Sequence, residues 1–211
     1  MKVLFAATFL LSGAALVAQA PATQAHTSAL GFTYKVPADW QVVDTSATLG
    51  DVKKQAEQNA TEDVDKRGAA CVSVSLTARH GAPASVMVIV ELPFACLGQT
   101  ATEKDLPGFA QGASEGLKQN FDLAEPVYGT YALGSHSMWV ERAQGTPKGH
   151  PELPYTVEVA CTLLKKGAVC WMTMAADAAS LQVFEGGTVT LEGDKAAALV
   201  PANAFEKKPA Q

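Results

Sequence analysis

The stretch of sequence that decides the fold is residues 155–176, YTVEVACTLLKKGAVCWMTMAA. In its first half, Tyr155 to Leu163, apolar residues alternate with Thr, Glu and Ala, which is the period of a β-strand. The second half, Ala168 to Ala176, is apolar throughout, as is typical of a strand that is buried on both faces. The turn Leu164-Lys165-Lys166-Gly167 between them predicts a hairpin whose second strand is central in its sheet.

Further hairpins are predicted on the N-terminal side of this one. Their strands are Cys71–Arg79 with Ser85–Leu92, turning at 80–84, and Val127–Leu133 with His136–Arg142, turning at Gly134-Ser135. Each pair joins runs rich in β-branched and aromatic residues through residues that favour turns. The alternating stretch from Phe32 to Val43 is broken by Pro37-Ala38-Asp39, which predicts either a hairpin or a tight strand-turn-strand corner.

Helices are predicted between and after these strands. An apolar stripe at helical spacing runs from a cap at Thr102 or Asp105 to Phe121, and Asp177 begins a short helix. The polar segment Thr48–Gly68 predicts a surface helix with a loop, 145–154 a loop and 196–199 a small helical stretch. Six to eight strands in consecutive hairpins, with two or three helices on the faces of the sheet, indicate the α+β class with an antiparallel sheet.

One segment carries a family resemblance. FTYKVPADW at 32–40 resembles the opening of PsbP-like domains, where an aromatic-x-aromatic pair precedes Pro-x-x-Trp. The helix from Lys104 to Phe121 and the late hairpin with its helix at Asp177 to Phe184 follow in a similar order, so the resemblance covers most of the chain. PsbP-like domains are named for the extrinsic accessory subunit of photosystem II. The resemblance implies an antiparallel sheet with helices on its faces and a non-catalytic accessory or binding role.

The first two dozen residues have the pattern of a cleavable export signal. Lys2 is followed by an apolar run from Val3 to Val17, which is short for a membrane span, and then by small-residue cleavage triplets. We expect cleavage after Ala22 or Ala25. The expected organisation is a signal peptide over residues 1–22, one globular domain over 26–205 and a flexible polar tail over 206–211, with no stable membrane anchor after cleavage and a periplasmic or secreted location.

The charge balance limits the classes of partner. The chain has 16 Lys and Arg against 21 Asp and Glu, and only Lys2 of these lies in the signal, so the exported part has a formal charge of −6. Nucleic acids and anionic membranes bind clustered Lys and Arg. We therefore expect no nucleic-acid partner, and expect instead an unknown protein partner or a small ligand.

Four cysteines follow the signal, and an even number in an exported chain predicts disulfides in one of three connectivities. The predicted hairpin at 71–92 brings Cys71 and Cys96 to the same end, which favours a bridge between them. For Cys161 and Cys170 the pairing depends on the turn. A two- or four-residue loop places them opposite each other, whereas a three-residue loop, favoured by Gly167 as a bulge residue, places them on opposite faces.

Candidate functional residues are few. We predict no catalytic residue, metal site or cofactor, because the histidines are scattered and Ser114, in the G-x-S-x-G match at 112–116, lies inside the predicted helix. Trp40, Trp139 and Trp171 are the candidate ligand or partner surface. The leading hypothesis is an exported, non-catalytic accessory or binding module, and the alternative is a secreted enzyme of thiol-redox or hydrolytic type.

Overall fold

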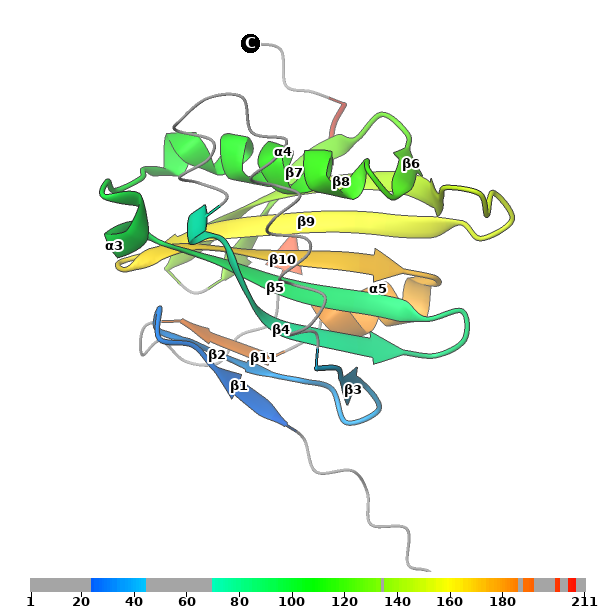
Figure 1. The fold of residues 1–211 in the computed structure, drawn as a ribbon, viewed down its shortest axis with the longest axis horizontal. Coiled ribbons are helices and arrows are strands. Elements are labelled where there is room, and N and C mark those ends of the chain that lie inside the picture. The colour runs from blue at the N-terminus through cyan, green and yellow to red at the C-terminus, as the bar shows by residue number, and fades with distance from the viewer. Residues whose placement is uncertain are drawn as a thin grey trace, which may run out of the picture.

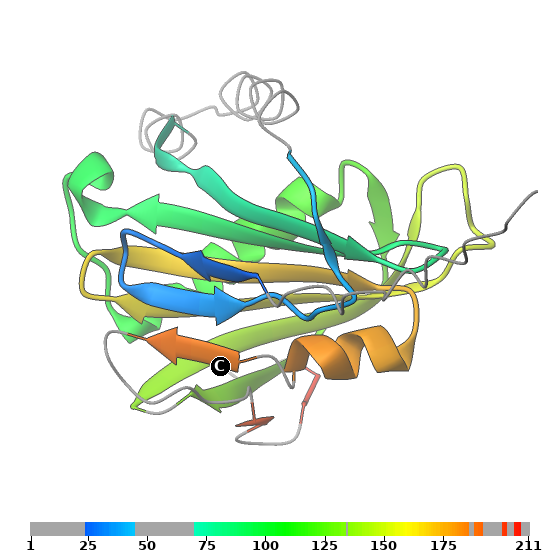
Figure 2. The same ribbon diagram turned by 90° about the horizontal axis from the view of Figure 1, so that it is seen from below.

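The fold has three layers, with a large antiparallel sheet in the middle (Figure 1). A computed structural model of the 211-residue chain describes residues 24–44, 70–133, 135–185, 188–191, 200–201 and 205–207. Helix α4 (Leu106–Leu117) covers one face of the large sheet, and a second, smaller sheet with helix α5 (Ala178–Glu185) covers the other (Figures 1 and 2). The predicted α+β class with an antiparallel sheet is confirmed.

The large sheet has nine strands within the described residues. Its order is β12 (Val200–Pro201), β7 (Val127–Leu133), β8 (His136–Pro147), β9 (Tyr155–Leu164), β10 (Gly167–Ala175), β5 (Ser85–Pro93), β4 (Ser73–His80) and β3 (Gln41–Val42), and β6 (Phe121–Leu123) pairs with β8. The small sheet has the order β1 (Ala25–Thr27), β2 (Phe32–Lys35) and β11 (Thr188–Leu191). Expectations for residues 1–23, for 48–68 and for 196–199 fall outside the described residues.

The hairpin at 155–176 is the centre of the large sheet, as predicted. β9 lies between β8 and β10, and β10 lies between β9 and β5. The expectation of a three-residue loop is wrong, because Leu164 pairs with Gly167 and only Lys165 and Lys166 form the turn. Gly167 is not a bulge residue at positive φ; a Cβ there would lie 2.7 Å from the Leu92 carbonyl oxygen, so the close approach of β5 requires glycine.

The segment from Phe32 to Val43 is a corner and not a hairpin. β2 belongs to the small sheet, while β3 pairs with β4 in the large sheet. The turn between them is closed by a hydrogen bond from the Trp40 N–H to the Pro37 carbonyl. This corner joins the two sheets covalently.

The predicted hairpins β4–β5 and β7–β8 are both present. Strand β8 continues to Pro147, into the stretch that the sequence predicts to be a loop from Gly145 onward. The reason is β6, whose residues Phe121 to Leu123 pair with Pro147 to Gly145. A Cβ at Gly145 would lie 2.6 Å from Leu123, so this glycine permits the pairing and does not break the strand.

The helices begin as predicted, and α4 ends earlier than predicted. Thr102 and Asp105 form a capping box, with the Thr102 N–H donating to the Asp105 carboxylate at 2.7 Å. Helix α4 stops at Leu117, because Phe121 pairs with β8. Asp177 caps α5 by accepting from the Ser180 N–H at 2.7 Å. Within the described part of the chain, no helix is long and apolar enough to cross a membrane.

Two hydrophobic cores flank the large sheet. The core between the two sheets is the larger, and its biggest fully buried side chains include Trp171, Tyr34, Tyr131 and Phe32. The second core lies between the large sheet and α4, and its buried members are Leu106, Ala110, Val159, Cys161 and Cys170. β9 and β10 are therefore buried on both faces, which explains the apolar character of β10.

Both pairs of cysteines are disulfide-bonded. The predicted Cys71–Cys96 bridge is present, with a Cα–Cα distance of 5.6 Å, and it joins the residues just before β4 to α3 (Phe94–Leu97). Cys161 and Cys170 are directly opposite one another across β9 and β10 and are also bridged. The two-residue turn sets the register that places both sulfurs on the face under α4. A register shifted by one residue would place one of them on the opposite face.

We expect removal of the Cys71–Cys96 bridge by the double substitution Cys71→Ser/Cys96→Ser to lower the free energy of unfolding by about 3 kcal/mol, since the bridge closes a loop in the unfolded chain. Urea denaturation under non-reducing conditions measures this loss. The matched control is Ser75→Ala in β4, whose hydroxyl is only partly buried and donates a hydrogen bond of 3.4 Å to the Ile89 carbonyl. Equal stability of the double variant and the parent would contradict the prediction.

The C-terminal segment pairs with the large sheet further along the chain than the sequence predicts. Glu206 was expected to begin a flexible tail. Its N–H instead donates a hydrogen bond to the Tyr128 carbonyl at 2.9 Å, and its carbonyl accepts one from the Tyr128 N–H at 2.8 Å. The ring of Phe205 packs on Gly129, where a Cβ would lie 3.1 Å from it. Glu206, where the polar tail was expected to begin, thus forms an antiparallel bridge with Tyr128 of β7.

Candidate functional site

The three tryptophans do not form one surface. Trp171 is 0% exposed and lies in the core between the sheets, with its ring 5.2 Å from that of Phe32. Trp40 is also buried in this core, and its ring stacks on His80. Trp139 is half-buried and lies on the other face of the large sheet, against the core beneath α4. Only Trp139 is placed to contribute to a surface site.

Trp139 belongs to a group of side chains that we call the aromatic–acidic patch: Ser114 and Lys118 at the end of α4, Tyr128 on β7, and Trp139 and Glu141 on β8. Tyr128 is directly opposite Glu141, and Trp139 lies two residues from Glu141 on the same strand. Side chains two residues apart on a strand share a face. The rings of Tyr128 and Trp139 are 5.9 Å apart and tilted by 38°.

The electrostatics of the patch centre on Glu141. Burial raises the pKa of the Glu141 carboxyl above its usual range, although a hydrogen bond with Ser114 and the charge of Lys118 act in the opposite direction. Burial, together with the nearby charge of Glu141, also raises the pKa of the Tyr128 hydroxyl. Lys118 is exposed and donates to Glu115 at 2.6 Å, which raises the pKa of Lys118. Groups with shifted pKa values gather at functional sites more often than elsewhere.

Ser114 acts here as a hydrogen-bonding partner and not as a nucleophile. It is buried on the inner side of α4, in the middle of the helix, and its hydroxyl is bonded to Glu141. A nucleophile elbow requires a sharp turn between a strand and a helix. The G-x-S-x-G match at 112–116 lies wholly within α4, so the helix explains the serine without catalysis.

We expect the side-chain carboxyl of Glu141 to titrate above the usual range of a glutamate in an NMR titration. The folded state then binds more protons than the unfolded state in the interval between the two pKa values, so Glu141 makes the free energy of unfolding fall as pH rises through its folded pKa. Ser114→Ala removes a bond that lowers the pKa and should move the midpoint further upward. A midpoint within or below the usual range would contradict this prediction.

Comparison with known proteins gives one finding about the fold. The solution structure of cyanobacterial PsbP (CyanoP) from Synechocystis sp. PCC 6803 is similar to this chain, with a TM-score of 0.44 and 14% identity over 82% of this chain and 91% of that chain. The fold resembles that of PsbP. The sequence matches no family model and no curated protein. This similarity agrees with the PsbP-like resemblance expected from the sequence, and no binding residue is transferred by it.

A buried polar cluster on the opposite face was missed by the sequence analysis. Glu158 on β9 is 0% exposed, and its carboxylate accepts hydrogen bonds from Arg142 at 2.8 and 2.6 Å and from the Tyr131 hydroxyl at 2.9 and 3.0 Å. The Arg142 guanidinium lies 4.3 Å from the centre of the Phe205 ring. The signal in the sequence is a glutamate within an otherwise apolar central strand, and Arg142 lies directly opposite it.

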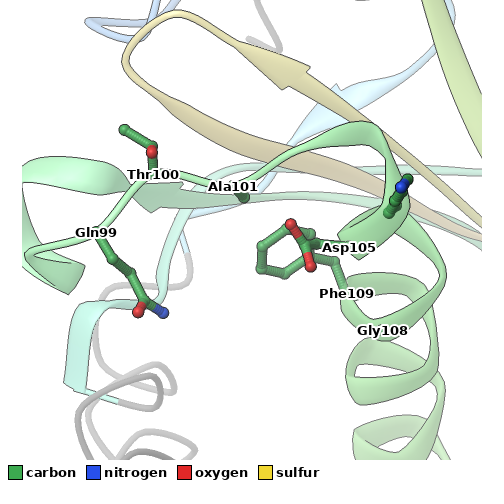
Figure 3. Close-up of a pocket in the computed structure, with 7 residues that line it drawn as sticks. Gln99, Thr100, Ala101, Asp105, Gly108 and Phe109 are labelled. Carbon is green, nitrogen blue, oxygen red and sulfur yellow. The ribbon is translucent and has the colours of Figure 1, made fainter.

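A shallow hollow of about 540 Å³ lies at the other end of α4 (Figure 3). It is lined by Gln99, Thr100, Ala101, Lys104, Asp105, Gly108 and Phe109. The Asp105 carboxylate is bonded to the N–H and hydroxyl of Thr102, which lowers the pKa of Asp105. Because this carboxylate serves the helix cap, the hollow holds fewer groups for a ligand than the aromatic–acidic patch.

The histidines and cysteines of the described residues are engaged in ion pairs, hydrogen bonds, ring contacts and disulfides. No group of three His, Cys, Asp or Glu side chains there is arranged to hold a metal ion. His80 is bonded to Asp39 at 3.1 Å near the corner after β2, and His150 to Glu152 in the loop before β9. All four cysteines are in disulfides.

Proposed function

We propose that this protein is an exported, non-catalytic accessory domain that binds a protein partner or a small ligand through the aromatic–acidic patch. The observation that carries the proposal is the patch itself, which places two half-buried aromatic rings beside a half-buried carboxyl. Tyrosine and tryptophan are enriched at interfaces because one side chain offers both apolar area and a polar group. The rings and Glu141 are held by adjacent strands, so the patch is already arranged for binding.

Export is supported by the disulfides and by the N-terminal sequence pattern. Disulfides form and persist in oxidising compartments, and this chain has two of them. The alternative, a thiol-redox or hydrolytic enzyme, has weaker support. Both cysteine pairs are in the oxidised state, the Cys161–Cys170 pair lies in the core beneath α4, and the one serine motif is inside a helix.

We further propose that the signal is cleaved after Ala22. Gln24 and Ala25 both take part in the fold: the Gln24 carbonyl accepts the Val36 N–H at 2.7 Å, and Ala25 is the first residue of β1, opposite Lys35. Cleavage after Ala25 would remove both. Intact-mass measurement of the exported protein should therefore give Thr23 as the first residue, and His26 as the first residue would contradict this.

The binding role is tested by photo-crosslinking in the exported compartment. A benzoylphenylalanine in place of Tyr128 should give one reproducible cross-linked species, and the same replacement at Val42, which is 43% exposed on β3 at the far edge of the sheet, should not. For a small ligand, the readout is a change in the NMR signals of residues 128–141 on addition of the compartment's small molecules. The proposal would be contradicted if neither the cross-link nor the change in NMR signals appeared. It would also be contradicted if the protein turned over a substrate in a hydrolase or oxidoreductase panel and a single substitution abolished that activity.

A further inference from the structure

The aromatic–acidic patch offers stacking and hydrogen bonding side by side. Tyr128 and Trp139 provide half-buried aromatic rings, and Glu141 and Lys118 provide polar groups near them. We propose that the ligand of this patch is a neutral saccharide chain of pyranose units. This inference rests on the proposed binding role and names the class of ligand.

The geometry of the rings favours a sugar over a cation. The Tyr128 and Trp139 rings touch each other, with their centroids 5.9 Å apart and their planes 38° apart. Rings that enclose a cation must stand apart so that it can enter between their faces. Two rings in contact present adjoining surfaces instead. A pyranose ring with equatorial hydroxyls has flat C–H faces that bury apolar area on such surfaces.

The polar groups beside the rings match a hydroxyl-rich ligand. Sugar hydroxyls donate and accept, and the patch has an acceptor in the carboxyl of Glu141 and a donor in the ammonium of Lys118. Glu141 is directly opposite Tyr128, so a sugar stacked on that ring lies beside the carboxyl. The bond between Ser114 and Glu141 holds the carboxyl in place.

The charges of the patch disfavour an anionic ligand. Glu141 and Glu115 both lie near Lys118, and the Lys118 ammonium is already bonded to Glu115 at 2.6 Å. A phosphate or carboxylate ligand would meet two carboxyls and one cation that is already paired. Like charges in contact weaken binding. A neutral ligand avoids this cost, which leaves the saccharide as the class that fits both the rings and the charges.

The test is an NMR titration of the exported domain with cellotetraose and with N-acetylchitotetraose. We expect one of these to shift the backbone signals of residues 114–118, 128–130 and 137–141, and to leave those of β1 to β3 unchanged. Tyr128→Ala should weaken binding about tenfold, which corresponds to about 1.4 kcal/mol. It is preferred to Trp139→Ala, because Trp139 packs on the core beneath α4. Phe109→Ala, at the other end of α4, is the matched control and should bind as the parent does.

The outcomes separate this inference from the binding role. No shift with either oligosaccharide up to about 10 mM, or shifts confined to another surface, would overturn the saccharide proposal. A specific photo-crosslink at position 128 without any saccharide shift would overturn it while leaving the binding role in place. Equal weakening by Tyr128→Ala and Phe109→Ala would also count against the patch as the site.

Discussion

Arg142→Met should lower the free energy of unfolding by about 3 to 5 kcal/mol, the usual cost of removing one partner from a buried ion pair. Glu158 is 0% exposed, and Arg142 is the cation that faces its carboxylate, at 2.6 and 2.8 Å. Methionine retains much of the apolar stem, so the loss measures mainly the unpaired charge. Denaturation in urea with the disulfides intact gives the free energy.

The control for this prediction is the double variant Arg142→Met/Glu158→Gln. Because it removes both charges, it should recover most of the stability that Arg142→Met loses, even though the Tyr131 hydroxyl then bonds a neutral amide. Such a recovery is a coupling between the two sites, which a double-mutant cycle measures. A loss of less than about 1 kcal/mol in Arg142→Met would contradict the importance of the pair.

Trp171→Ala should have an effect of similar size, about 3 to 5 kcal/mol, because it leaves a large cavity in the core between the two sheets. Trp171 is 0% exposed and is the largest fully buried side chain; its ring packs against Phe32 of the small sheet. The cavity therefore weakens the packing between the two sheets and the packing of side chains on the large sheet itself. The measurement is the urea midpoint together with the slope of the transition.

Trp171→Phe is the matched variant, with an expected loss of about 1 kcal/mol. The indole N–H of Trp171 has no hydrogen-bond partner among the described residues, so its removal breaks no bond. An equal loss in Trp171→Phe and Trp171→Ala would contradict this prediction, because phenylalanine should retain most of the packing of the ring. Trp139→Phe, on the half-buried patch, should change stability less than Trp171→Ala does, because surface substitutions usually have small effects.

Most of the large sheet could be predicted from the sequence, because its signals are local. Period-two alternation at 155–163 and turn residues between paired runs depend only on neighbouring residues. The Cys71–Cys96 bridge followed from the same reasoning, since a hairpin brings its two ends together. The short strands β1, β6 and β12 could not be predicted, because a strand of two or three residues has no period of its own.

The candidate site was predicted only in part. Trp139 was named because it is a large aromatic residue in a hairpin, and the structure leaves it half-buried at the surface. Trp40 and Trp171 were named on the same ground and are buried in the core between the sheets. Composition alone does not separate them, since burial depends on which face the small sheet covers. Glu141 and Ser114 meet only because α4 folds back onto β8.

The sequence alone determined the class of the fold, the three main hairpins, the starts of α4 and α5 and the even set of cysteines. The tertiary structure decided the turn at Lys165-Lys166, the pairing of Cys161 with Cys170 and the partner of Glu158. The physical reason is the range of the forces involved. Strand and turn preferences act between neighbouring residues, whereas register depends on contacts between distant segments, as where β5 approaches Gly167 so closely that no side chain fits.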